Sequence, residues 1–220
     1  MKWLWRALFA LFALFMAWHE WRGPPLTQAE TEALLAELAA NRRAGDGNAF
    51  ADAAGDHDLL QDLRRLAASD DGAQYFMVNL IRFRERALYP PGQEALGTDA
   101  RAADDRYSAI VVPELLARGS YPIYVSDVAG EFIGYPGAEP WDAVAIVRYR
   151  SRRDMLDMVR ALQRKGGGMH KWAAIETTHV FPTHASIRVA PLPVLVGMAL
   201  LLVGTSVQLL VWRLGAAQRQ

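Results

Sequence analysis

The feature that most constrains this chain is the stretch at residues 189–212, which carries no charged side chain. About 20 apolar residues in a helix span the ~30 Å hydrocarbon core of a bilayer. Trp212 and Arg213 end the stretch as an interfacial anchor followed by a charge in water would. The sequence therefore predicts a transmembrane helix at 190–212, with a buried core helix of a soluble domain as the alternative. Gly197 and Gly204 fall on one face and would allow a close helix contact, unless they simply face lipid.

The N-terminus has a second apolar run, at residues 7–18, preceded by Lys2 and Arg6. A secretory signal peptide begins in the same way, but no small-x-small cleavage site follows the run. Tryptophans bracket it instead, as interfacial anchors do: Trp3, Trp5, Trp18 and Trp21. We expect an uncleaved anchor helix at 3–21, and a cleaved signal is the alternative.

The positive charge flanking the two apolar runs predicts their orientation. The terminal sides carry Lys2, Arg6, Arg213 and Arg219, and the inner sides carry only Arg22 and Arg188. Because cytoplasmic flanks are enriched in Lys and Arg, both termini are expected in the cytoplasm of a bacterial inner-membrane protein. Residues between the spans would then face the periplasm.

Composition excludes several classes of protein. The chain has no cysteine, so disulfides, thiolate metal sites and cysteine nucleophiles are ruled out. It has 24 Lys and Arg against 24 Asp and Glu, which does not suit a nucleic-acid binder. The charges are nevertheless segregated, with acidic residues concentrated in 30–71 and basic ones in 148–171. The basic segment could hold an anionic ligand or lipid headgroups, but complementing the acidic segment of the same chain is the preferred interpretation.

Residues 26–71 are expected to form a helical preface. Thr27 and Glu30 have the spacing of a capping box, and Leu34, Leu35 and Leu38 share one helix face. A loop is predicted at 45–55, after which Asp56 would cap a second helix.

Residues 73–188 are predicted to fold as a β-α-β-β-α-β unit. Its strands are expected at 74–83, 121–128 (continued by 131–134 after a bend or as a hairpin), 141–150 and 177–189. Its helices are expected at 100–119, where Pro113 would kink or split the helix, and at 152–165, capped by Ser151 with Asp154. The glycines at 166–168 would break the second helix and lead into a short turn at 169–175.

This order is the ferredoxin-like plan, an α+β fold whose antiparallel sheet carries both helices on one face. The strands are apolar on both sides, so the other face also needs a cover. A second copy of the sheet would make a homodimer, and the leading helices are the alternative cover.

The chain resembles the dimeric α/β-barrel superfamily and, within it, an uncharacterised bacterial family of unknown function. The resembling residues lie in order over 73–183: VNLIRFR with a following Tyr89, Tyr107 with PELLARG, IYVSDVAGEFIG, WDAVAIVRYRSRRDML and HKWAAIETT. The resemblance implies two sheets packed face to face and a ligand cleft between sheet and helices in each subunit. The superfamily contains monooxygenases, haem-degrading enzymes, isomerases and stress proteins, so the fold alone does not define the chemistry.

In the haem-degrading relatives, an Asn on the first strand acts with a Trp on the second helix and a His after it. Asn79 and His170 stand at or near the outer two positions, but Met158 occupies the Trp position, which argues against haem degradation. Asn79 stands mid-strand among apolar neighbours, so it either binds a ligand or is satisfied by a neighbouring group.

His170 with Glu176 could form a general-base pair, or His170 could be a surface histidine. The predicted catalytic residues are thus Asn79, His170 and Glu176. Tyr107, Tyr124, Arg148 and Trp172 are predicted to bind a ligand, with Arg148 as an anion contact, and the alternative for the two tyrosines is a place in the core. We predict no cofactor and no metal site, because the histidines lack a ligand spacing.

Two functions follow. The first is a membrane-tethered domain that binds a small apolar or aromatic molecule, with monooxygenase- or isomerase-like activity as an open question. The second is a non-catalytic dimerisation module of a membrane complex.

Overall fold

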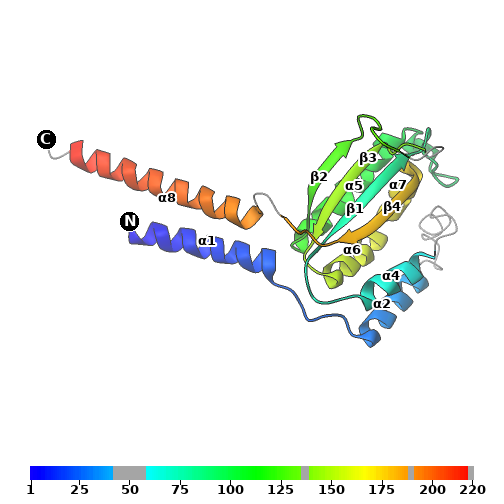
Figure 1. Ribbon diagram of the computed structural model, residues 1–220, viewed down its shortest axis with the longest axis horizontal. Helices are drawn as coiled ribbons and strands as arrows, with labels where there is room; N and C mark the ends of the chain where they lie inside the picture. The colour runs from blue at the N-terminus through cyan, green and yellow to red at the C-terminus, as the bar shows by residue number, and fades with distance from the viewer. Residues whose placement is uncertain (42–57, 135–138, 188–190, 218–220) are drawn as a thin grey trace. The chain divides into compact units, whose positions relative to one another are not determined.

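The computed structural model describes residues 1–41, 58–134, 139–187 and 191–217 (Figure 1). The chain divides into two compact units. One consists of Met1–Trp21 with Ala185–Gln220, and the other of Arg22–His184. The predicted loop at 45–55, the predicted cap Asp56, and the flanking residues Arg188 and Arg219 lie outside the described ranges.

The larger unit contains a four-stranded antiparallel sheet, as predicted for an α+β fold. Its strands are β1 (Tyr75–Phe83), β2 (Tyr121–Asp127), β3 (Ala143–Tyr149) and β4 (Ile175–Thr183), in the order β2-β3-β1-β4. Two strand predictions were wrong at their ends. Residues 131–134 do not continue the second strand, and β4 ends at Thr183 because residues 184–187 leave the ladder.

Helices α5 (Ala100–Ala117) and α6 (Arg152–Arg164) lie on one face of the sheet (Figure 1). The Ser151 hydroxyl accepts a hydrogen bond from the Asp154 amide, so the predicted cap of α6 is confirmed. Pro113 does not split α5, which runs through it as one helix.

The turn predicted at 169–175 is instead a helix, α7 (Gly167–Ala174). Gly166 adopts a left-handed conformation with φ of +69°, which only glycine adopts without strain. Gly167 then begins α7 directly, and a Cβ there would lie 2.2 Å from Leu162 of α6. The glycines thus turn the chain from one helix into the next, where a loop was expected.

The core forms between the sheet and these helices. Tyr75, Met77 and Tyr149 from the sheet pack with Leu156 and Leu162 of α6. Since side chains alternate along a strand, the residues between them on β1 point to the opposite face. That opposite face carries partly exposed apolar side chains: Val78, Leu80, Val144, Ile146 and Phe181.

Helices α2 (Gln28–Asn41) and α4 (Leu59–Ala68) extend the helical layer. Their buried Leu34, Leu35, Leu38 and Leu63 belong to the same core cluster as Tyr75. The suggestion that the leading helices cover the opposite face of the sheet was therefore wrong, because their apolar stripe packs on α6. The capping box is confirmed, since Glu30 and Thr27 each accept a hydrogen bond from the other's backbone amide. The N-cap of α4 is Asp58 rather than the predicted Asp56.

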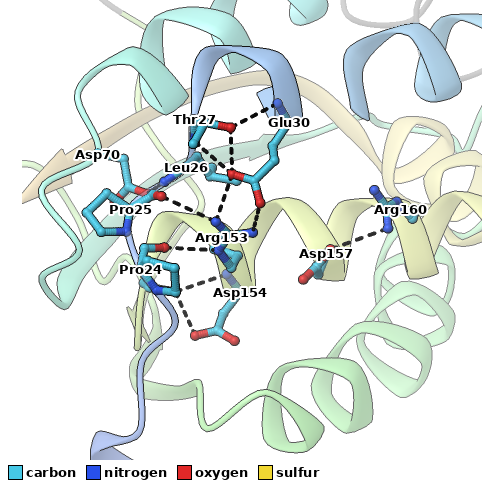
Figure 2. A network of polar contacts seen from close by, with 11 residues as sticks. Pro24, Pro25, Leu26, Thr27, Glu30, Asp70, Arg153, Asp154, Asp157 and Arg160 are labelled. Atoms are coloured by element: carbon cyan, nitrogen blue, oxygen red, sulfur yellow. Dashed lines mark hydrogen bonds and ion pairs between the residues drawn. The ribbon is translucent and has the colours of Figure 1, made fainter. Parts of the chain in front are cut away.

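Acidic side chains of residues 26–71 form ion pairs with basic side chains of α6, which is the interpretation preferred in the sequence analysis. Arg160 and Arg164 of α6 bind Glu37, and Arg152 binds Asp71. Arg153 binds Glu30 and also donates to the carbonyls of Pro24 and Pro25 (Figure 2).

The smaller unit consists of α1 (Lys2–Glu20) packed against α8 (Leu192–Ala217). The Trp5 indole donates a hydrogen bond to the Gln208 side chain at 2.9 Å. A Cβ on Gly204 would lie 2.6 Å from the Trp5 ring, so the close contact expected there forms with α1. Within the described ranges, only α8 is long and apolar enough to cross a membrane.

Candidate functional site

A polar cluster lies where the loop after β1 meets α7. The Tyr89 hydroxyl is 2.9 Å from Nδ1 of His170, and the two rings meet edge to face. The backbone fixes this position, because the Leu88 amide donates to the Ala173 carbonyl and the Arg84 amide to the Ala174 carbonyl. The loop carrying Tyr89 is therefore tied to the last turn of the helix that carries His170.

Arg106 of α5 completes the cluster, with one guanidinium nitrogen 3.5 Å from the Tyr89 oxygen. Burial, and secondarily the Arg106 charge, lowers the pKa of His170 from its ordinary value of 6.5. The imidazole is consequently neutral near pH 7. The Tyr89 hydroxyl and Nδ1 of His170 can share their hydrogen bond in either direction, because a phenol and a neutral imidazole nitrogen can each donate or accept.

The next residue, Lys171, lies against two aromatic rings. Its Nζ is 5.7 Å from the centre of the Tyr107 ring and 5.2 Å from that of Trp172. Trp172 is buried, and Lys171 and Tyr107 are half-buried. No hydrogen bond or ion pair reaches Nζ from the part of the chain that the structure describes. Burial lowers the pKa of Lys171, while the charge of Asp104 on α5 opposes that shift.

Helices α5 and α7 pack closely here through small side chains. Ala103 of α5 is fully buried together with Ala173 and Ala174 of α7. The close contact also buries polar groups of α5. Burial raises the pKa of the Asp104 carboxyl, helped by neighbouring Asp105, and raises that of the Tyr107 phenol.

Asn79 faces the helices from the middle of β1. Its side-chain amide donates to the carbonyls of Met77 at 3.2 Å and Ala145 at 3.1 Å. The neighbouring backbone therefore satisfies the amide nitrogen. This agrees with the interpretation that a neighbouring group, and not a ligand, satisfies Asn79.

Glu176 forms an ion pair with Arg82 at 3.2 Å, while His170 binds Tyr89. Both residues are described, and neither a hydrogen bond nor an ion pair joins them. The candidate general base is thus arranged by a phenol and not by the carboxylate named from the sequence.

Tyr124 and Arg148 point away from this cluster. Tyr124 pairs with Ile146, and Arg148 pairs with Phe76, so both lie on the face opposite Asn79. Tyr124 is 53% exposed. Arg148 is buried, and it donates to the Gln74 side chain and to the Gly119 carbonyl at 2.6 Å. Of the four predicted ligand-binding residues, the fold brings only Tyr107 and Trp172 to the His170 cluster.

Sequence reasoning missed Tyr89, Arg106 and Lys171 as members of this cluster. Tyr89 lies in a loop, where no periodicity predicts what a side chain faces. Lysine usage could have drawn attention to Lys171, because the chain has only three lysines, namely Lys2, Lys165 and Lys171. Met158, which the sequence resemblance aligned with the Trp of the haem-degrading enzymes, is buried in the core.

Comparisons with known proteins identify a fold neighbour of unknown function. No protein-family model and no curated protein matches the chain. A crystal structure of methylated RPA0582 protein superposes with a TM-score of 0.52 and 25% identity over 60% of this chain and 93% of that one. A second crystal structure, of the RPA0582 protein of unknown function from Rhodopseudomonas palustris, gives the same TM-score and identity over 58% and 94%.

Proposed function

We propose that this chain is a membrane-anchored protein that binds a small apolar or aromatic molecule beside the Tyr89–His170 pair. The observation that carries the proposal is the Arg106–Tyr89–His170 chain of polar groups. It is half-buried, it involves a neutral imidazole, and the rings of Tyr107 and Trp172 lie close by. Perturbed titratable groups beside apolar surface are typical of binding and catalytic sites.

The fold we assign is the ferredoxin-like unit of the dimeric α/β-barrel superfamily. Support comes from the strand order β2-β3-β1-β4 with helices on one face, and from the residues of the sequence resemblance. In this assignment the RPA0582 protein, matched over 93% of its length by 60% of this chain, is a neighbour of the same fold, and α1 and α8 are additions to that fold.

We place α8 across a bacterial inner membrane and α1 beside it as a second span. The Trp5–Gln208 hydrogen bond supports this pairing, because a polar side chain in lipid needs a partner. The flanking Lys2, Arg6 and Arg213 favour cytoplasmic termini and a periplasmic domain. A reporter fused after Gln220 that is active only when exported would be silent, and an active reporter would reverse the orientation.

A homodimer formed through the apolar face of the sheet is the second part of the proposal. The partly exposed Val78, Ile146 and Phe181 form adjacent cross-strand neighbours on that face. A dimer that buried these three side chains would also suit the second candidate function, a non-catalytic dimerisation module. Ile146→Asp would convert a dimer of the detergent-purified protein into a monomer, measured by light scattering, whereas an unchanged mass would exclude this interface.

The decisive experiment is mass spectrometry of small molecules retained by the detergent-purified full chain. We expect an aromatic or apolar compound that is retained by the wild type and by His184→Ala, and lost in His170→Ala. His184 is a suitable control because it is exposed and follows Thr183, which pairs with Phe76 at the start of β1, whereas Tyr89 follows the end of β1. Equal retention by both variants would contradict a site at His170 and leave dimerisation as the remaining function.

A further inference from the structure

Arg106 differs from the other helical arginines of the larger unit in having no carboxylate partner. Every arginine of α4 and α6 lies within ion-pair distance of an Asp or Glu side chain. Arg101, the other arginine of α5, binds Asp127. For Arg106, the polar contact that the described residues provide is the Tyr89 hydroxyl at 3.5 Å. Its positive charge is therefore left without a counter-charge.

The surroundings of Arg106 add positive charge and do not remove it. Lys171 lies over the rings of Tyr107 and Trp172, and such cation–π contacts stabilise its ammonium form. Asp104 is the acidic group that acts on Lys171, but within the described ranges no carboxylate oxygen lies at ion-pair distance from Nζ. Arg106 is half-buried, and a charge that is partly removed from water without a partner is costly. An anion bound there would offset this cost.

We propose that Arg106, together with the Tyr89 hydroxyl and the His170 imidazole, binds the carboxylate of an aromatic acid. The inference rests on the proposed function, because it names the chemical class of the molecule bound beside Tyr89 and His170.

The geometry of the three side chains suits a carboxylate. A guanidinium is a planar fork of N–H donors that binds the two oxygens of a carboxylate with parallel hydrogen bonds. The contact with Tyr89 uses one of the guanidinium nitrogens of Arg106. When Nδ1–H of His170 donates to the Tyr89 oxygen, the phenol proton is available to a carboxylate oxygen. All three side chains are partly exposed, so a ligand in solution can reach them.

Aromatic surface lies at the same point. The rings of Tyr89 and His170 meet edge to face, with their centres 5.7 Å apart. A ring attached to the bound carboxylate would add a further aromatic contact there, since edge-to-face and offset packing of rings is favourable. A molecule with both a carboxylate and an aromatic ring thus uses the charge of Arg106 and the rings beside it.

NMR titration with sodium benzoate tests the inference on the full-length protein in detergent, at constant ionic strength. The ring protons of His170 report binding, and we expect benzoate to raise the pKa of His170, because the carboxylate offsets the Arg106 charge. Arg106→Met should weaken benzoate binding at least about tenfold, the effect of losing hydrogen bonds between charged groups. Arg101→Met is the matched control on the same helix and should bind benzoate as the wild type does. Equal affinity in the two variants would overturn the inference.

Arg106→Lys provides a second, more conservative variant. It keeps the positive charge but lacks the planar fork, so benzoate should bind more weakly than to the wild type. Wild-type affinity in Arg106→Lys would contradict the paired hydrogen bonds from the guanidinium.

Three further probes separate this inference from the proposed function. Benzyl alcohol that binds as tightly as benzoate, with or without Arg106, would retain the aromatic site and reject the carboxylate contact. Acetate that binds as tightly as benzoate and is lost in Arg106→Met would support the carboxylate contact and count against aromatic binding. Inorganic phosphate that binds more tightly than benzoate would overturn the assignment of a carboxylate. A His170 ring that responds to none of these compounds would overturn both proposals.

Discussion

The Tyr89 hydroxyl and Nδ1 of His170 lie 2.9 Å apart although 81 residues separate them in the chain. One comes from the loop after β1 and the other from α7, and two backbone hydrogen bonds tie these segments together. The pair is therefore held by main-chain geometry, so that the side chains can be varied without moving the segments that carry them.

Arg106→Met should raise the pKa of His170 towards its ordinary value of 6.5, because the guanidinium charge disfavours the imidazolium ion. NMR titration of the ring protons measures this directly. Arg101→Met is the matched control, since Arg101 lies over the Phe83 ring and binds Asp127. A His170 pKa that is unchanged in Arg106→Met would show that burial alone sets it.

Tyr75→Phe and Tyr89→Phe should have opposite effects on stability. The buried Tyr75 hydroxyl has no hydrogen-bond partner in the described part of the chain, so its removal should raise the free energy of unfolding by about 1 kcal/mol. Removing the Tyr89 hydroxyl breaks the hydrogen bond to His170 and should lower the free energy of unfolding by about 1 kcal/mol. Denaturant unfolding followed by near-UV circular dichroism compares the two. Destabilisation by Tyr75→Phe would imply a partner outside the described residues.

Arg153→Lys should loosen the linker at Pro24 and Pro25, because one ammonium group cannot reproduce the several bonds of the guanidinium (Figure 2). The Leu26 amide, which donates to Asp70, reports on this segment, and its hydrogen exchange should accelerate. Arg160→Lys, on the same helix but paired with Glu37, should leave that amide unchanged.

The contact between Arg153 and the segment at Pro24 and Pro25 should also depend on pH, because Arg153 binds Glu30. Hydrogen bonding from Arg153, with further bonds from Thr27, lowers the pKa of Glu30 from 4.5 to about 2. The folded state thus favours the ionised form, so its stabilising effect is complete above pH 4.5 and declines as the pH falls towards 2. The difference in Leu26 exchange between wild type and Glu30→Gln should persist at pH 4 and disappear near pH 2. A difference already lost at pH 4 would contradict the lowered pKa.

Gly204→Val should separate α1 from α8, since a Cβ at Gly204 would overlap the Trp5 ring. Overpacking of this kind costs about 1–3 kcal/mol. Gly215→Val is the control, because nothing lies within 4 Å of its Cβ position. The chain has no cysteine, so cysteines placed at Phe12 and Gly197 can be joined by a short bismaleimide. Cross-linking should fall in Gly204→Val only.

The strands and most helices were predictable because their signals are local. The aromatic and β-branched run that became β1, the Thr27–Glu30 capping box and the Ser151 cap each act over a few residues. The wrong predictions share one cause, because tertiary packing decided the structure where the local sequence pattern indicated something else. A glycine run is typical of a break, yet Gly167 begins a helix, and the side chains of Leu162 and Ile110 occupy the space where its Cβ would lie.

The candidate site was predicted only in part for the same reason. Tyr107, Trp172 and His170 were named from residue type, and the fold does bring them together. Arg148 and Tyr124 were placed on the wrong side of the sheet. Arg148 lies on β3, whose pairing with β1 is regular, so simple alternation already puts it opposite Asn79. For Tyr124, the irregular register between Pro122 and Tyr124 shifts which residues of β2 face the helices. A pattern of alternation cannot reveal such a shift.

The bond between Trp5 and Gln208 has a consequence for biosynthesis. These residues are 203 positions apart, so α1 is made long before α8 leaves the ribosome. In a bilayer, Gln208 would enter lipid with an unpaired amide unless Trp5 were already present. In the proposed two-span arrangement, translation order would therefore deliver the indole donor first, and α8 would pack against a helix that is already in place.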